Sequence, residues 1–288
     1  MSLFNVSRLL GKTILITGAS SGIGAATALL FAKAGSNVIL VARRADALKS
    51  VADACVAAHK ESGVAQGGKF ATIQADVADK EQVASILDKI PSDLRAVDVL
   101  VNNAGQVSYP RSDINNLLIP LRRFVKGIEH IGDIADADVE GMFATNVLGL
   151  IRLTQIFVKE FKARNSGHVI NLGSVAGREA YAGGGIYCAT KFAVSAFNGS
   201  LLKELVNTPI RVTEIQPGMV ETEFSIVRFR GDTDRAKTVY DGMQPLVASD
   251  IAEEILWVAS RPPHVNIAEM LIFPVNQAGA GVVYRAPK

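Results

Sequence analysis

Short apolar runs alternate along the chain with longer stretches of helical period. The runs are rich in Val, Ile and Leu and are apolar throughout, which is typical of strands buried on both faces of a parallel sheet. The predicted strands are Thr13–Thr17, Val38–Ala42, Lys69–Ala75, Val97–Asn102, His168–Leu172, Arg211–Gln216 and Met270–Phe273. Among the predicted helices between them are Gly24–Ala34, Lys80–Ile90, Asp138–Ala163 and Ala189–Val206.

This alternation predicts one α/β domain. Right-handed crossovers wind such a sheet in both directions from its first strand, so we expect a Rossmann-type doubly wound parallel sheet with helices on both faces. No internal repeat, low-complexity tract or convincing linker divides the chain. We therefore predict a single catalytic domain over residues 1–288.

Two segments interrupt the alternation. Residues 106–132 contain Pro110, Pro120 and a group of basic side chains, and residues 221–244 follow a Pro-Gly turn and carry further arginines. Loops of this length are uncommon in a compact domain unless they serve a site. We interpret residues 221–244 as a substrate lid.

Composition excludes several classes of partner. The chain has 30 basic and 28 acidic residues, a net charge of +2, and 49% hydrophobic residues. This balance favours a small-molecule substrate and gives no reason to expect nucleic acid or a membrane as a partner. No uninterrupted apolar run reaches the ~18 residues of a membrane span. The four histidines are scattered without metal-ligand spacing, so we expect no metal site.

Cysteine usage and the N-terminus bear on location. The two cysteines, Cys55 and Cys188, lie in helical patterns and are expected to be small buried side chains in a reducing compartment, with a redox pair as the alternative. Residues 2–10 lack acidic side chains, as transit peptides do, but they lead directly into the first strand. We therefore expect a cytoplasmic protein.

A glycine-rich turn joins the first strand to the first helix. Its sequence, Thr-Gly-Ala-Ser-Ser-Gly-Ile-Gly, runs from Thr17 to Gly24. Glycines let the backbone approach a pyrophosphate closely, and the N-terminus of the helix favours an anion. A tight turn without a ligand is the alternative, but the first strand–helix junction is where nucleotides bind in such sheets.

The end of the second strand indicates which dinucleotide. A site for NAD usually places Asp or Glu here, whereas this chain has Ala42 followed by Arg43 and Arg44. A guanidinium binds a 2′-phosphate that a carboxylate would repel, so the pair favours NADP(H) over a merely solvated face. Asp76, after the third strand, is expected to bond the adenine amino group or to cap the helix near Lys80.

A tyrosine and a lysine lie on one helix face. Tyr187 and Lys191 are at positions i and i+4, and Ser174 follows the strand His168–Leu172 at its carboxyl end. Such a pair is common on surface helices and means little alone. Its combination with the glycine-rich turn, Ser174 and the strand ends favours a functional role for the pair.

These motifs together resemble the short-chain dehydrogenase/reductase family over essentially the whole chain. The resemblance rests on the turn at Thr17–Gly24, Asn102-Asn103-Ala104-Gly105, Asn146, Ser174, the Tyr187/Lys191 pair and Pro217-Gly218. It implies a catalytic set of Asn146, Ser174, Tyr187 and Lys191, with Asn146 holding a water in a proton relay from Lys191. It also implies that Asn102 and Gly105 support the cofactor and that Thr222 reaches the carboxamide. The cofactor-binding residues expected on this basis are Gly18, Ser20, Ser21, Gly22, Ile23, Gly24, Arg43, Arg44, Asp76, Val77, Asn103, Ala104, Gly105, Tyr187, Lys191, Pro217, Gly218, Val220 and Thr222.

The implied roles agree with elementary chemistry. A free tyrosine has a pKa of about 10, which is too high for an efficient base near neutral pH. The Lys191 ammonium and an oxidised nicotinamide both favour the phenolate. Lowering this pKa by about three units requires roughly 4 kcal/mol of such preference.

Part of the sequence resembles one branch of that family. The stretches Asn171–Arg178, Tyr181–Gly184, Glu221–Asp232 and Leu271–Gln277 are similar to NADP-dependent 3-hydroxy acid dehydrogenases, most of all the fungal ones. The resemblance implies a cytosolic homotetramer that oxidises serine, allo-threonine and related 3-hydroxy acids.

A 3-hydroxy acid needs a cation for its carboxylate. We predict that Arg228 supplies it, with Arg178 and Arg230 as alternatives and surface solubility as the competing role of each. The chain departs from the branch between Gly105 and Asn146, where it is longer. The surplus, about residues 107–124, is interpreted as an insertion: a lid element, a surface elaboration or an artefact of gene annotation.

Two other functions fit the same motifs. An NADPH-dependent carbonyl reductase of ketones, diketones or ketoesters would use the same groups on an uncharged substrate. A non-catalytic NADP(H) sensor would use the turn alone, but such proteins usually lack the tyrosine or the lysine, and both are present here.

Overall fold

A seven-stranded parallel sheet forms the centre of the molecule. The computed structural model describes residues 5–105, 131–132, 134–223, 234 and 238–286. The strands stand in the order β3-β2-β1-β4-β5-β6-β9, and every neighbouring pair is parallel. They are β1 Thr13–Thr17, β2 Asn37–Ala42, β3 Phe70–Gln74, β4 Val99–Asn102, β5 His168–Leu172, β6 Arg211–Pro217 and β9 Glu269–Ile272. The predicted doubly wound α/β fold is confirmed, with each predicted strand matched to within a few residues.

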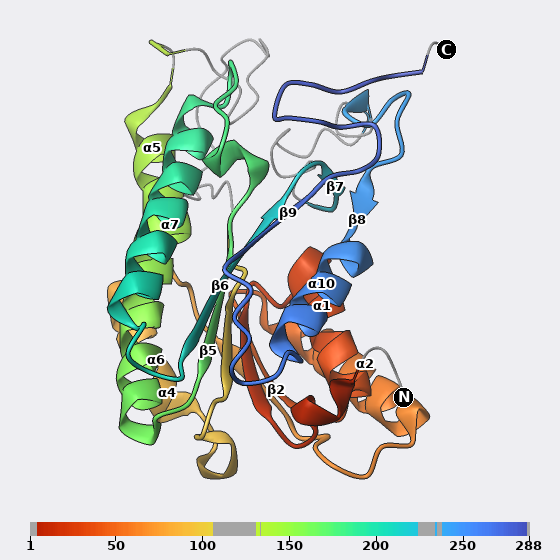
Figure 1. The fold of residues 1–288 in the computed structure, drawn as a ribbon, viewed down its shortest axis with the longest axis vertical. Helices are drawn as coiled ribbons and strands as arrows, with labels where there is room; N and C mark the ends of the chain where they lie inside the picture. The colour runs from red at the N-terminus through yellow and green to blue at the C-terminus, as the bar shows by residue number, and fades with distance from the viewer. Residues whose placement is uncertain (1–4, 106–130, 133, 224–233, 235–237, 287–288) are drawn as a thin grey trace, which may run out of the picture.

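Helices cover both faces of this sheet (Figure 1). One face carries α1 Gly22–Lys33, α2 Ala45–Ser62 and α10 Ala248–Ala259. The other carries α4 Ile86–Lys89, α5 Asp136–Phe143, α6 Leu150–Arg164 and α7 Gly185–Glu204. The remaining elements are the short helices η1 Val6–Leu9, α3 Lys80–Ala84, η2 Ser92–Leu94 and η4 Val175–Gly177, and a small sheet of β7 Val220–Glu221 with β8 Leu246–Val247.

Each face of the sheet has its own apolar core. Alternate residues of a strand point to opposite faces, so Ile14 and Ile16 pack under α1 and α10, whereas Leu15 packs under α6 and α7. All five residues of β1 and all five of β5 are buried. This is why the strands read as continuous apolar runs rather than as alternating patterns. Cys55 and Cys188 are free and buried, as predicted.

Two predicted helices differ from the observed ones. The helix predicted over Lys80–Ile90 breaks at Ser85 into α3 and α4. The helix predicted over Asp138–Ala163 is present, but its middle turn, Ala144–Gly149 (η3), is π-helical. Hydrophobic spacing does not reveal such a turn because the apolar stripe continues across it.

The long helix Asp136–Arg164 is the one described helix that is long and apolar enough to cross a membrane by length and composition. Its apolar side is in fact a core face, because Leu153, Phe157 and Phe161 are almost fully buried against the sheet. About half of its most apolar window, 56%, is buried inside the protein.

The order in which the chain adds strands to the sheet reverses between β1 and β4. The chain leaves β1 toward one face and β4 toward the other, so a crevice opens at the carboxyl ends of these two strands. The glycine-rich turn, Arg43, Asn103 and Ser174 all follow strands at this edge.

Candidate active site

A cavity of about 360 Å³ occupies this edge of the sheet. Most of the predicted site residues line it, including both arginines after β2 and the Tyr187/Lys191 pair. The predicted residues in its wall are Gly18, Ser20, Ser21, Gly22, Ile23, Arg43, Arg44, Asp76, Val77, Asn103, Ala104, Gly105, Ser174, Tyr187, Lys191, Pro217, Gly218, Val220 and Thr222.

The glycine-rich turn is shaped for a close approach. Gly18 has a φ of +65°, and a methyl group on Gly24 would lie 2.5 Å from the Gly18 carbonyl oxygen. Helix α1 begins at Gly22, and its N-cap residue Ser21 makes no side-chain capping bond. The first N–H groups of α1 therefore remain available to an anion at the cavity wall, as a pyrophosphate requires.

Asn103 and Thr17 fasten the loop after β4 to this turn. The Asn103 side-chain amide donates to the carbonyl oxygens of Thr17 (2.9 Å) and Gly18 (3.3 Å). In return, Thr17 Oγ1 accepts from the backbone N–H groups of Asn103 and Ala104. Asn103 thus shapes the cofactor groove, and its side chain is already committed to the turn.

The arginines after β2 lie at the far end of the cavity. Arg44 Nη2 donates to Ser21 Oγ (2.9 Å), to Ser20 Oγ (3.3 Å) and to Glu223 Oε2 (3.2 Å). Arg43 Nη1 lies 3.7 Å from Asp76 Oδ2. Asp76 does not cap the helix near Lys80, because Asp79 is its N-cap. Two guanidinium groups at this position fit a phosphate on the adenosine ribose.

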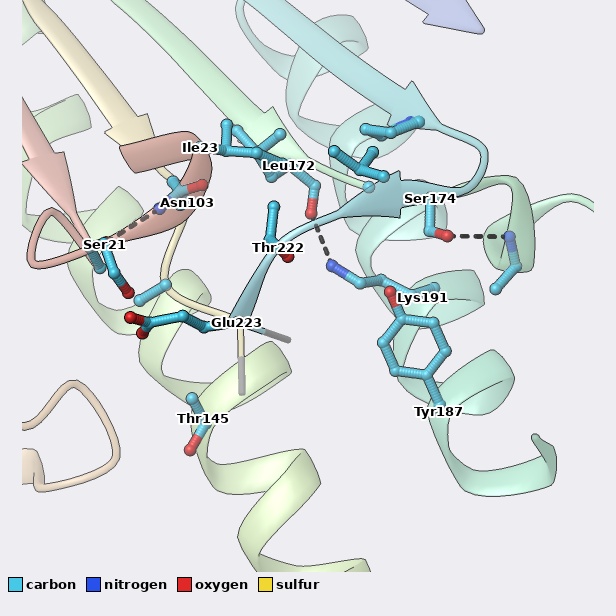
Figure 2. A pocket seen from close by; sticks show the side chains of 18 of the residues that line it. Ser21, Ile23, Asn103, Thr145, Leu172, Ser174, Tyr187, Lys191, Thr222 and Glu223 are labelled. Carbon is cyan, nitrogen blue, oxygen red and sulfur yellow. Dashed lines mark hydrogen bonds between the residues drawn. The ribbon is translucent and has the colours of Figure 1, made fainter. Parts of the chain in front are cut away.

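The Tyr187/Lys191 pair lies at the opposite end, on helix α7 (Figure 2). The Lys191 ammonium donates to the carbonyl oxygen of Leu172 (2.7 Å), at the end of β5, and lies 5.8 Å from the centre of the Tyr187 ring. Burial lowers the pKa of the Lys191 ammonium to about 8, and the charge of Glu214 opposes that shift. The pair therefore places a desolvated cation beside a phenol that faces the cavity.

Asn146 approaches this pair from the π-helical turn η3. Its side-chain amide donates to Thr190 Oγ1 (3.3 Å), and that hydroxyl donates to the Tyr187 carbonyl oxygen (2.7 Å). A methyl group on Gly105 would lie 3.7 Å from Lys191 Nζ and 3.8 Å from Asn146 Oδ1. Gly105 thus leaves a space that both polar atoms face, and it is suited to a bridging water. π-Helical turns are frequent at functional sites.

Ser174 stands where β5 ends. Its hydroxyl oxygen accepts from the N–H of Ala176 (3.1 Å) as the N-cap of η4. That bond leaves the hydroxyl hydrogen free to donate to a substrate oxygen. Ser174, Tyr187 and Lys191 all lie within one end of the cavity (Figure 2).

A buried carboxylate supports this end from below, and sequence reasoning missed it. Glu214 in β6 is fully buried, and Ser195 Oγ donates to its Oε1 (2.7 Å). A methyl group on Gly173 would lie 2.1 Å from that same oxygen, so Glu214 packs directly under the strand end that carries Ser174. Burial raises the pKa of the Glu214 carboxyl. No spacing in the sequence links residue 214 to residue 195.

Asn102 has a structural role. Its side-chain amide donates to Thr154 Oγ1 (2.8 Å) and to Asn171 Oδ1 (2.9 Å), and Asn171 in turn donates to Asn198 (3.0 Å). This chain of bonds joins β4, β5, α6 and α7 within the core. Asn102 therefore supports the cofactor groove from behind, through the framework.

Other residues missed from the sequence close the groove on the side of β6. Gln277 is almost fully buried and accepts from the N–H of Met219 (2.7 Å), and the hydroxyl of Tyr240 donates to the Val220 carbonyl oxygen (2.8 Å). Both line the cavity. They fix the loop after β6 that carries Thr222.

Of the three arginines predicted to bind the substrate carboxylate, the structure describes only Arg178. Arg178 does not line the described part of the cavity, because its guanidinium donates to Gln216 and to Glu269. Its role toward a substrate carboxylate stays a prediction, and the guanidinium already has these two partners. Arg228, Arg230, the surplus 107–124 and most of the lid segment lie outside the described residues. Within the described residues, no group of three His, Cys, Asp or Glu side chains is placed to hold a metal ion.

A family model described as short chain dehydrogenase matches residues 12–232. The chain is 40% identical over 281 residues to an NADP-dependent 3-hydroxy acid dehydrogenase of Schizosaccharomyces pombe, covering 97% of this chain and 99% of the relative. It is 37% identical over 274 residues to a serine 3-dehydrogenase of Agrobacterium fabrum, covering 95% and 98%.

Solved structures agree with the sequence comparison. The closed form of a serine dehydrogenase complexed with NADP+ superimposes with a TM-score of 0.80 at 34% identity, covering 96% of this chain and all of that structure. A serine dehydrogenase from Escherichia coli gives a TM-score of 0.71 at 30% identity, covering 92% and 99%.

Proposed function

Because this chain belongs to the short chain dehydrogenase family, we propose that it is an NADP-dependent oxidoreductase that oxidises the 3-hydroxyl of small 3-hydroxy acids. Serine, allo-threonine and 3-hydroxyisobutyrate are the expected substrates, and the reverse reaction would reduce the matching carbonyl. One observation carries the proposal: a single cavity holds Ser174, Tyr187 and Lys191 at one end and Arg44 at the other. The names of the relatives, NADP-dependent 3-hydroxy acid and serine dehydrogenases, support the substrate class.

The groove fits NADP(H) along its length. The open N-terminus of α1 suits the pyrophosphate, and Arg43 and Arg44 suit the 2′-phosphate. The side chain of Asp76 faces the same end and is proposed to bond the adenine. Lys191, at the other end, is proposed to hold the nicotinamide ribose, and Thr222, beside Gly22 of the turn, is proposed to hold the carboxamide.

Proton transfer falls to Tyr187. The Ser174 hydroxyl donates to the substrate oxygen and holds the carbinol carbon toward the nicotinamide. The Tyr187 phenolate then takes the proton from the 3-hydroxyl as general base. When bound, NADP+ accepts the hydride from that carbon. The Lys191 ammonium lowers the pKa of the phenol, because a positive charge within a few ångströms favours the anion in a low-dielectric site.

The proton leaves through the groups behind Tyr187. We propose that the space between Gly105, Asn146 and Lys191 holds a water that passes the proton toward solvent. The Asn146 side-chain nitrogen donates to Thr190, and this bond leaves the Asn146 side-chain oxygen on the side of Gly105. Asn146 belongs to the π-helical turn Ala144–Gly149, in which it is buried.

The carboxylate of the substrate requires a cation. Arg178 is engaged by Glu269 and Gln216, so we propose Arg228 for this role. Replacing Arg228 with Ala should raise the KM for L-serine by about 10- to 100-fold, the loss expected for a charge-assisted hydrogen bond. An unchanged KM would remove Arg228 from the site. Steady-state rates over a range of serine concentrations measure this effect.

A panel of substrates tests the whole proposal. Initial rates with NADP+ should be measured for L-serine, L-allo-threonine, 3-hydroxyisobutyrate and 2-butanol, which has the alcohol without the carboxylate. The proposal predicts that kcat/KM for the hydroxy acids exceeds that for 2-butanol. A reversed order would favour a carbonyl reductase of uncharged ketones. No turnover of any alcohol or ketone would favour a cofactor sensor.

The assembly and the location of the protein are further parts of the proposal. Leu148 and Phe192 expose 43% of their surfaces each on the helical face formed by α5, α6 and α7. We propose a homotetramer, as the resemblance to the 3-hydroxy acid dehydrogenases implies, with these side chains at an interface between subunits. The two buried free cysteines suit a reducing compartment, and we propose a cytoplasmic location. Light scattering of the purified protein tests the assembly.

A further inference from the structure

Each arginine after β2 is paired with a carboxylate that also lines the cavity. Arg43 Nη1 lies 3.7 Å from Asp76 Oδ2, and Arg44 Nη2 lies 3.2 Å from Glu223 Oε2. These are the guanidinium groups that suit the 2′-phosphate of NADP(H). An anion that binds there meets cations that already have partners.

The two carboxylates differ in how firmly they are held. Asp76 Oδ1 accepts from the N–H of Ala78 (2.9 Å), which anchors the side chain beside its own backbone. Glu223 is half-exposed, and Arg44 is the only partner of its carboxylate among the residues that the structure describes. Glu223 can therefore leave its arginine without breaking any other described bond.

The Arg44–Glu223 pair joins two walls of the groove. Arg44 also bonds Ser20 and Ser21 of the glycine-rich turn, whereas Glu223 follows Thr222 on the opposite wall (Figure 2). A methyl group on Gly22 would lie 3.6 Å from Thr222 Cβ, so these walls already approach closely here. The bridge stands between the adenosine end and the segment proposed to hold the carboxamide.

We propose that Glu223 is a cofactor-discriminating residue whose carboxylate occupies the position on Arg44 that the 2′-phosphate of NADP(H) takes. The phosphate must displace Glu223, so the carboxylate weakens binding of the phosphorylated cofactor. NAD(H) has a ribose hydroxyl there and leaves the Arg44–Glu223 pair intact. Arg44 makes the protein bind NADP(H) more tightly than NAD(H), and Glu223 thereby reduces the ratio of the two affinities. This inference rests on the proposed use of NADP(H).

The expected size of the effect follows from exposure. The side chains of Arg44 and Glu223 are 54% and 55% exposed, so solvent screens the pair. Exposed ion pairs contribute little, and their loss changes an equilibrium by about two- to fivefold. Neutralising Glu223 should therefore tighten NADPH binding by about that factor. Added salt should reduce the difference in NADPH affinity between Glu223→Gln and the unsubstituted protein, because salt screens both the Glu223 carboxylate and the 2′-phosphate.

The experiment measures binding of NADPH and NADH by fluorescence titration of the whole protein. The variants are Glu223→Gln, Arg44→Ala, the double variant and the control Glu221→Gln. Glu221 is an exposed carboxylate two positions earlier, and its removal changes the net charge equally. We expect Glu223→Gln to bind NADPH about two- to fivefold more tightly and NADH within about twofold of the original protein. Glu221→Gln should leave both affinities within about twofold.

The double variant separates competition for Arg44 from direct repulsion of the phosphate. In an Arg44→Ala background, competition predicts that Glu223→Gln has no further effect on the Kd for NADPH. A persistent gain would overturn the proposal in favour of repulsion. Weaker NADPH binding by Glu223→Gln, or an equal gain in Glu221→Gln, would overturn it too. If the unsubstituted protein binds NADH as tightly as NADPH, the proposed cofactor fails, and this inference fails with it.

Discussion

The two ends of the cavity hold their charges in opposite ways. At the catalytic end, Lys191 is buried, and its ammonium is fixed by the Leu172 carbonyl and by the nearby charge of Glu214. At the adenosine end, Arg44 and Glu223 are about half exposed and face solvent. A buried charge interacts strongly but is costly to desolvate, whereas an exposed charge costs little and interacts weakly.

This difference divides the work of the site. The buried end is proposed to set the protonation of Tyr187, so we expect substitutions there to change turnover and stability. The exposed end has interchangeable partners, so substitutions there should change only which cofactor binds. The variants below separate the two ends, beginning with the largest effect.

Tyr187→Phe should lower kcat for L-serine oxidation by about 10³-fold, because the proton then has no general base. The Kd for NADPH should stay within about twofold, since the phenol contributes to chemistry more than to binding. Rapid mixing gives the first value and fluorescence titration the second. Tyr284→Phe, on an exposed tyrosine, is the matched control. Turnover that survives in Tyr187→Phe contradicts the assignment of the base.

Lys191→Met should stabilise the protein in the absence of cofactor while abolishing turnover. Burial lowers the pKa of Lys191 in the folded protein to about 8, below its usual value of 10.5. The unfolded chain therefore binds the proton more tightly, and the ammonium costs stability fully below pH 8. This cost disappears as the pH rises from 8 toward 10.5.

The gain in the free energy of unfolding at pH 7 should be about 1–3 kcal/mol, since the Leu172 carbonyl loses a partner that offsets part of the benefit. Urea unfolding at pH 7 and pH 10 measures the difference, which should shrink at the higher pH. An advantage that grows with pH would contradict the sign. Lys203→Met, on the same helix and less buried, is the control.

Arg44→Ala should raise the Kd for NADPH by about 10-fold or more and leave that for NADH within about twofold. The variant loses a guanidinium–phosphate bond to NADPH, whereas NADH has no 2′-phosphate and loses no such bond. Titration with both cofactors checks the ratio, with the exposed Arg95→Ala as control. Equal weakening for NADPH and NADH would mean that Arg44 acts on the shared pyrophosphate.

The fold and the motif residues were predictable because they depend on local patterns. Strand β5 reads as buried on both faces because it is, and the four-residue spacing of Tyr187 and Lys191 survives unchanged on α7. The glycines of the first turn predict that the backbone approaches a ligand closely there. Each of these features is written within a few neighbouring residues.

The missed features depend on contacts between distant residues. Glu223 meets Arg44 across 179 positions, and Arg178 meets Glu269 across 91. Charge alone suggested Arg178 as a substrate cation, and the sequence does not show that Gln216 and Glu269 bind its guanidinium. The π-helical turn at Asn146 was also missed, because an extra residue in one turn leaves the apolar stripe intact.

The most direct test of the account is the oxidation of L-serine by the unsubstituted protein with NADP+ and with NAD+. We predict saturable formation of NADPH and a kcat/KM that is at least about 10-fold lower with NAD+, the discrimination expected from one charge-assisted phosphate contact. Equal values of kcat/KM with the two cofactors, or no reduction of NADP+ by any 3-hydroxy acid, would contradict the account.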